Sequence, residues 1–361
     1  MSPTFATPLA MLALAASAGL SAPAHAGNLS FKPTGVIYYD ALHADPDVKP
    51  FDDVDKVRSA RLGFVLKAGD RWQFNVEHEF TDRSTPDVVL QLTPAKGHTL
   101  RLGQFKQPFL LEDATSARQT PMMEASLLGA FALGRRIGLG YGYANGDHAV
   151  NAAMFGQRLD GKNEGLGAAV RASRVLHFGD DLLHLGLGAA MEDPDSDAAR
   201  FSSKPESALA TSSLVDTGTL AGVDRIVRTG VEAAWIAGRW SLQGEAAAVR
   251  ATRDAADLRG TGGYALASWS PSGHRRSYKA GTVSSPALGD GMAWELFVRY
   301  STLDLNSAAS SGGHQADWNF GATWYLNPYA RVMANYVIAD SHRRGVDDDP
   351  RLLQVRMQLQ F

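Results

Sequence analysis

The sequence predicts an all-β protein, a transmembrane antiparallel β-barrel of about 16 strands. Three observations carry this prediction: runs in which apolar and polar residues alternate, connections that are alternately short and long, and an export signal at the N-terminus. Side chains point alternately to the two sides of a strand, so each run has one apolar and one polar face. A barrel in lipid turns its apolar faces outward.

Residues 1–26 are expected to form a cleaved secretory signal peptide. An apolar segment precedes Ala24-His25-Ala26, which matches the A-x-A cleavage pattern. The n-region MSPT has no Lys or Arg, and the alternative is a buried N-terminal helix. No later segment approaches the roughly 20 apolar residues of a membrane helix. We therefore expect an exported barrel domain, residues 27–361.

The alternation is clearest near the C-terminus. Trp318, Phe320 and Trp324 share one face of a strand, and Asn319 and Thr323 lie on the other. About sixteen such runs follow one another, each near the ten residues that a tilted strand needs to cross a bilayer. The count is even, as in single-chain bacterial barrels. The runs begin near Leu29, Val57, Arg71, Pro86, His98, Gly134, His148, Glu164, Asp181, Ile226, Arg239, Gly262, Gly291, Gln315, Pro328 and Pro350.

The connections between these runs alternate in length. Short links rich in turn residues are expected at 69–70, 94–97, 145–147, 178–180, 237–239 and 327–328. Long links are expected at 43–56, 107–133, 193–225 and 303–314. Outer-membrane barrels place their short turns on the periplasmic side. Residues 270–290 disagree, since they are long where a short turn is expected; they form an extended turn or contain a hairpin.

Composition narrows the functional classes. The chain has no cysteine, which excludes metal-thiolate and cysteine-nucleophile chemistry. It has no HExxH, GxSxG or P-loop motif, so we expect no catalytic residue, no metal and no cofactor. An outer-membrane lipase or protease carried on a barrel is the alternative from another class, but Ser and His are dispersed through the expected loops. We also expect no nucleic-acid partner.

Several segments together resemble a known family. The segment GQFKQPF, residues 103–109, ends a strand, and GRRIG, residues 134–138, opens the next one after a long loop. This arrangement, with further matches at 61–80, 293–306 and 324–337, resembles the phosphate-selective porin O and P family over about residues 57–361. The chain departs from the family at SPSGHRRSY, residues 270–278, where a Leu-Thr-Gly-Glu segment before an Arg and a Tyr is usual.

The resemblance implies a passive, water-filled channel in the outer membrane of a Gram-negative bacterium. It implies a sixteen-stranded barrel, usually a homotrimer, in which the loop after Phe109 folds inward and constricts the pore. Phosphate selectivity in the named members depends on a ladder of lumen arginines, so membership alone does not establish it. The partners expected are small anions, outer-membrane lipid and lipopolysaccharide. The barrel-assembly machinery is expected to recognise Phe361, which is in phase with the apolar face of the last strand.

An anion-selective pore needs Lys or Arg on the wet face of its strands. The candidate pore-lining or anion-binding residues are Arg61, Lys67, Arg101, Lys106, Arg118, Arg135, Arg136, Arg171 and Arg299. The expected constriction loop, residues 107–133, also carries Glu112, Asp113 and Glu124. Two hypotheses remain open: a channel for small anions, foremost phosphate or polyphosphate, and a general diffusion porin with weak selectivity.

Overall fold

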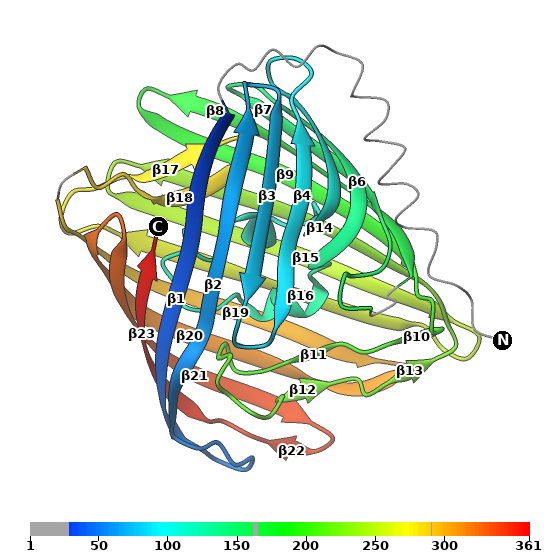
Figure 1. The fold of residues 1–361 in the computed structure, drawn as a ribbon. Coiled ribbons are helices and arrows are strands. Elements are labelled where there is room, and N and C mark those ends of the chain that lie inside the picture. The colour runs from blue at the N-terminus through cyan, green and yellow to red at the C-terminus, as the bar shows by residue number, and fades with distance from the viewer. Residues whose placement is uncertain (1–28, 162–164, 290) are drawn as a thin grey trace.

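The computed structural model describes residues 29–161, 165–289 and 291–361. The expected signal peptide, residues 1–26, lies outside this part of the chain. Sixteen long strands form one closed antiparallel barrel, which Figure 1 shows from the side. Each strand pairs with its neighbours in sequence order, and the first pairs with the last: Val36 lies opposite Gln360, and Asp45 opposite Arg351. The predicted fold class is confirmed.

The strands of the barrel are long because a tilted strand must span the bilayer. Those of the first half are β1 (Leu29–Asp45), β2 (Val54–Ala68), β3 (Trp72–Glu79), β4 (Ser84–Leu92), β5 (His98–Lys106), β6 (Arg135–Ala144), β7 (His148–Phe155), β8 (Leu166–Phe178) and β9 (Asp181–Asp193). Those of the second half are β14 (Val223–Ala237), β15 (Trp240–Arg253), β16 (Leu258–Trp269), β19 (Ala293–Ser307), β20 (Ser310–Asn327), β21 (Ala330–Arg343) and β23 (Arg351–Gln360).

Alternation along each strand separates an outer from an inner face. On β23, Leu353, Val355 and Met357 are exposed on the outside, whereas Gln354 and Arg356 are buried in the lumen. Trp294 and Tyr300 of β19 and Trp318 and Phe320 of β20 are also on the outside, where the rings of Trp294 and Trp324 stack at 5.1 Å. The costly apolar faces therefore meet lipid, and the polar faces meet each other inside the barrel.

The two rims differ in the length of their connections. Short turns join β2 to β3, β6 to β7, β8 to β9, β14 to β15 and β20 to β21, and the two longest loops, 107–134 and 194–222, lie on the other rim. The predicted long link at 303–314 is wrong, because β19 ends at Ser307 and β20 begins at Ser310. Its Ser and Gly residues suggested a loop, but the ladder continues through them, with Asp304 opposite His314.

The long connection on the short-turn rim contains a hairpin. Strands β17 (Arg276–Lys279) and β18 (Thr282–Pro286) form a separate two-stranded sheet within residues 270–292. This hairpin folds into the lumen, where the Tyr278 hydroxyl lies 2.7 Å from Nδ1 of His184. The turn of the hairpin reaches the wall at β8, where Arg171 donates to the carbonyl of Gly281 at 2.6 Å.

Two segments enter the lumen from the long-loop rim. The inner loop, residues 107–134, contains the short helix α2 (Leu111–Ala114) and the 3₁₀ turn η1 (Leu127–Phe131). The rim loop, residues 194–222, carries the short strands β10 (Ala198–Ala199), β11 (Ser202–Ser203), β12 (Val215–Asp216) and β13 (Leu220–Ala221). Figure 1 shows these strands at the end of the barrel opposite β17 and β18. The two-residue strand β22 (Val346–Asp347) pairs with β21 at the same rim as the rim loop.

The lumen is partly filled by an apolar core. Phe109, Leu128 and Phe131 of the inner loop pack with residues of the rim loop and of the inner faces of β14–β16. Gly230 and Gly262 leave room for this packing, because a Cβ at either position would meet a leucine of the inner loop within 3.3 Å. Within the described residues, no helix is long and apolar enough to span a membrane.

Candidate functional site: the constricted lumen

The inner loop is fastened to one side of the barrel by its own backbone. Arg356 donates to the carbonyl of Met123 at 2.6 Å, and Arg331 donates to that of Thr120 at 2.8 Å. Thr323 donates to the carbonyl of Pro121 at 2.6 Å. These bonds hold the loop against β20, β21 and β23. They also satisfy carbonyls that an irregular loop cannot pair within itself.

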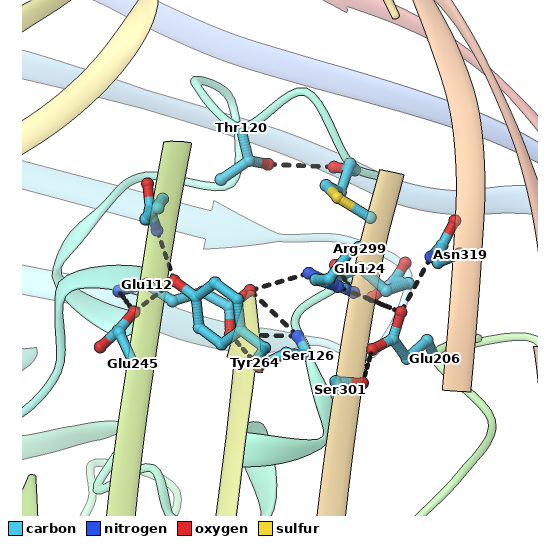
Figure 2. Close-up of polar contacts among 12 residues, drawn as sticks. Glu112, Thr120, Glu124, Ser126, Glu206, Glu245, Tyr264, Arg299, Ser301 and Asn319 are labelled. Atoms are coloured by element: carbon cyan, nitrogen blue, oxygen red, sulfur yellow. Dashed lines mark hydrogen bonds and ion pairs between the residues drawn. The ribbon is translucent and has the colours of Figure 1, made fainter. Parts of the chain in front are cut away.

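Arg299 joins the inner loop, the rim loop and β19. Its guanidinium donates to Glu206 at 2.5 Å, to Glu112 at 2.9 Å and to the carbonyl of Glu124 at 3.1 Å, as Figure 2 shows. Glu206 also accepts from Asn319 at 2.9 Å. The side chains of Arg299 and Glu206 are only 1% and 0% exposed. A charge buried so deeply requires this full set of partners.

A second carboxylate holds the start of the helix in the inner loop. Glu245 of β15 accepts from the backbone N–H groups of Leu111 and Glu112, at 2.8 and 2.7 Å. The hydroxyl of Tyr264 on β16 donates to the same carboxylate at 2.5 Å. The first N–H groups of α2 have no partner within the helix, so a wall carboxylate serves as their acceptor.

One open part of the lumen is a cavity of about 630 Å³. This main cavity lies between the inner loop and the walls of β1–β5. Five carboxylates line it: Glu77, Asp87, Glu112, Asp113 and Glu124. Seven cationic side chains line it: Arg58, Arg61, Arg101, Lys106, Arg118, Arg135 and Arg356. Both signs of charge therefore face the passage, with an excess of cations.

Most of these cations are neutralised by a neighbouring carboxylate. Arg118 lies 2.6 Å from Glu77, and Arg135 lies 3.0 Å from Asp87. The other pairs are Arg58 with Glu124, Arg61 with Glu79, Lys106 with Asp113, and Arg356 with Asp40 and Glu124. Among the described residues, Arg101 of β5 is the lining cation that has no carboxylate within 4 Å. Its positive charge is therefore the least compensated on the wall.

The structure distributes the sequence-predicted residues over three places. Arg61, Arg101, Lys106, Arg118 and Arg135 line the main cavity. Lys67 is on the inner face of β2 near the short-turn rim and is exposed, outside the lining of this cavity. Arg136, Arg171 and Arg299 face inward but are buried beneath other segments.

The three buried arginines have carboxylate partners that are far away in the sequence. Arg136 contacts Glu192 at 3.1 Å, and Arg171 contacts Glu232 at 2.6 Å. Strand phase correctly predicts that they point inward. It contains no information on which inward side chains a loop or a hairpin later covers.

Sequence reasoning missed Arg58. Strict alternation assigns this residue to the lipid face, together with Leu62. The register of β1 and β2 shifts between Tyr38 and Tyr39, so that Tyr38 pairs with Ser59 and Tyr39 with Val57. This bulge inserts Arg58 as an extra residue and turns its side chain to the main cavity. No local composition signal marks the bulge.

The sequence of this chain has known relatives. It matches the family described as "Phosphate-selective porin O and P" over residues 31–361. The chain belongs to this family. The resemblance found in the sequence is thereby confirmed, and the family and the barrel fold together indicate an outer-membrane porin.

Two curated relatives have sequences similar to this porin. An uncharacterized protein of Caulobacter vibrioides is 29% identical over 377 residues, which cover 93% of this chain and 75% of the relative. Porin O of Pseudomonas aeruginosa is 27% identical over 222 residues, which cover 52% of this chain and 51% of the relative. The second match therefore extends over about half of each protein.

Solved structures with low sequence identity share the fold. The anion-selective porin from Comamonas acidovorans has a TM-score of 0.64 at 13% identity, over 92% of this chain and all of that one. The trimer form of OmpT, an outer membrane protein of Vibrio cholerae, has a TM-score of 0.60 at 12% identity, over 92% of this chain and 99% of that one. At such identities these similarities concern the fold alone.

The site contains no recognisable catalytic arrangement in the described residues. No group of three or more His, Asp or Glu side chains there is placed to hold a metal ion. The His and carboxylate side chains of the lumen are engaged in wall contacts, such as that of His184 with Glu232 at 2.9 Å. Family and fold point to a channel rather than an enzyme.

Proposed function

We propose that this porin is a passive channel for small anions, with phosphate or polyphosphate foremost. The observation that carries the proposal is Arg101, a cation on the wall of the main cavity with no carboxylate of the described residues within 4 Å. Low-dielectric walls strengthen the field of such a charge and raise the local concentration of anions. The family description and the similarity of fold to the anion-selective porin of Comamonas acidovorans support anion passage.

The assembly proposed is a homotrimer in the outer membrane. Two observations support this assembly: the similar fold of OmpT of Vibrio cholerae, whose structure is a trimer form, and the family to which the chain belongs. Export through a cleaved signal peptide at residues 1–26, contact with lipopolysaccharide, and recognition of Phe361 by the assembly machinery belong to the same proposal.

A general diffusion porin is the second candidate. The five carboxylates of the main cavity favour it, because paired charges of both signs create a transverse field with weak preference for either ion. The two candidates differ in one measurable quantity, the reversal potential across a planar bilayer under a salt gradient. An unselective or cation-preferring pore would leave the second candidate standing.

Replacement of Arg101 tests the residue that carries the proposal. We expect Arg101→Gln to move the reversal potential toward cations and to weaken any block of chloride current by added phosphate. Arg259→Gln is the matched control, because Arg259 is an exposed arginine of β16 that does not line the cavity. It removes the same charge from the protein, so equal shifts in the two variants would contradict a local role for Arg101.

A further inference from the structure

A second, smaller cavity lies on the short-turn side of the inner loop. It has a volume of about 240 Å³ and lies between the inner loop, the segment after β18, and the ends of β20, β21 and β23. Arg118 lines both this second cavity and the main one, so the two meet at this side chain. The second cavity therefore lies next to the constriction, toward the periplasmic rim.

The lining of the second cavity differs in charge from that of the main cavity. Arg118 and Arg331 line it together with amide and hydroxyl side chains, and none of its described lining residues is a carboxylate. The nearby Glu295 is already engaged, since Arg276 donates to it at 2.9 Å and Tyr325 at 2.9 Å. Arg118 is paired with Glu77 at 2.6 Å, so the net positive charge of the second cavity comes from Arg331.

Arg331 is an unusual buried arginine in this lumen. It is 3% exposed, and no carboxylate of the described chain lies within 4 Å of it. By contrast, Arg171 and Arg356 each have a carboxylate oxygen at 2.6 Å. Burial of a charge without a counter-charge is costly.

The hydrogen bonds of Arg331 leave one of its three nitrogens without a partner. Its two terminal nitrogens donate to the carbonyls of Thr120 and Ala117, and to Oε1 of Gln358 at 2.7 Å. Its Nε is buried and has no partner in the described structure. An unsatisfied buried donor on an uncompensated cation calls for an acceptor with negative charge.

We propose that the second cavity is a binding site for a small oxyanion with the size and charge of phosphate or sulfate. Arg331 supplies the uncompensated charge, and Arg118, which is paired with Glu77, supplies a second guanidinium at the border with the main cavity. Gln119 adds an amide, whose oxygen is held by the backbone N–H of Ser285 at 3.2 Å, leaving its nitrogen as a donor. A cavity of this volume accommodates such an ion with several waters.

This site extends the proposed function. It rests on that function in one respect, namely that the anion reaches the site through the main cavity. An anion that leaves the main cavity past Arg118 enters a second positive region before the periplasm. Two sites in series allow an ion to bind and still leave, since occupancy of one weakens retention at the other.

The test places a carboxylate inside the second cavity with minimal change of shape. Gln358→Glu puts a carboxylate oxygen where Oε1 now lies, 2.7 Å from Arg331. Asn327→Asp adds a charge at the rim of the cavity and keeps the acceptor that now bonds Tyr329 and Ala330 at 2.8 and 2.9 Å. Neither variant removes a contact that holds the inner loop. Gln73→Glu is the control, a lumen-facing residue of β3 that lines neither cavity.

Calorimetric titration of the purified full-length porin with inorganic phosphate measures the site directly. We expect Gln358→Glu and Asn327→Asp to weaken one component of phosphate binding by roughly tenfold or more, because each supplies an internal counter-charge. Gln73→Glu should retain both components, and Arg101→Gln should affect only the component of the main cavity. The site is refuted by wild-type protein that binds no phosphate, or by equal effects of Gln358→Glu and Gln73→Glu.

The reversal potential separates this proposal from the proposed function. If the pore prefers anions and Gln358→Glu leaves phosphate binding unchanged, the proposed function stands and the second site is refuted. If Gln358→Glu weakens phosphate binding but the pore shows no preference for anions, the second site stands and the proposed anion selectivity is refuted.

Discussion

Removal of the Arg299 guanidinium should detach the inner loop while the barrel stays closed. Arg299→Met leaves Glu206 buried without its cation and deprives Glu112 and the Glu124 carbonyl of a donor. Loss of one partner from a buried ion pair costs about 3–5 kcal/mol. Every 1.4 kcal/mol is about a factor of ten in an equilibrium constant, so the ratio of docked to detached loop should fall by about two to four powers of ten.

Single-channel recording can detect this shift. The detached loop no longer narrows the passage, so Arg299→Met should show larger conductance, with transitions between levels. The sixteen-stranded ladder is unchanged, so we expect the protein to retain heat-modifiable migration on a gel.

Two controls make this interpretation specific. Arg200→Met removes an arginine from a pair of similar length, 2.6 Å to Asp216, but its side chain is 58% exposed. Such a surface pair contributes about 0–1 kcal/mol, so conductance should stay unchanged. Removal of both charges in Arg299→Met with Glu206→Met should cost less than the single variant. Wild-type conductance and noise in Arg299→Met would refute Arg299 as an anchor of the loop.

Three further predictions concern the seam, the hairpin and a loop. The backbone N–H and C=O of Phe361 both pair with β1 at 3.1 Å, so its deletion should reduce the amount of heat-modifiable barrel in the outer membrane. Gly281→Val should displace the hairpin from the lumen and raise conductance, because a Cβ at this positive φ would lie 3.1 Å from Ala149 and Ser173 on the wall. Gly238→Val, in an open turn, should not raise conductance. The pKa of Asp53 is lowered by the N–H of Ala44 and by His43, so proteolysis of loop 46–53 should increase as pH falls below about 4.

Each of these three expectations has a clear contrary result. Normal insertion without Phe361 would show that the seam closes without this residue. Equal conductance changes in the two glycine variants would reflect backbone strain alone. The sign for Asp53 follows from its lowered folded pKa: the stabilisation is present above the unfolded pKa and is lost as pH falls through the folded one. Proteolysis that stays constant as pH falls below about 4 would contradict it.

Local pattern determined the barrel. A side-chain period of two fixes which residue of each strand meets lipid, and the outward face of β23 follows it from Leu353 to Phe361. The same phase predicted that Arg101, Arg171 and Arg299 point inward. Turn residues located most of the short-turn rim, because Gly adopts the positive φ that several turns need, and the side chains of Asn145 and Asn327 accept backbone N–H bonds within their turns. These are properties of neighbouring residues, so they can be inferred from the sequence alone.

Only the tertiary structure decided which inward charges are exposed to the passage. Arg171 and Arg299 have the same strand phase as Arg101, yet the hairpin covers the first and the two inserted loops cover the second. Arg58 faces the main cavity because of a bulge between β1 and β2. Arg331 meets backbone carbonyls of the inner loop, and no carboxylate of the described residues lies within 4 Å of it. The electrostatics of a pore depend on distances between segments far apart in the chain, and strand periodicity does not encode those distances.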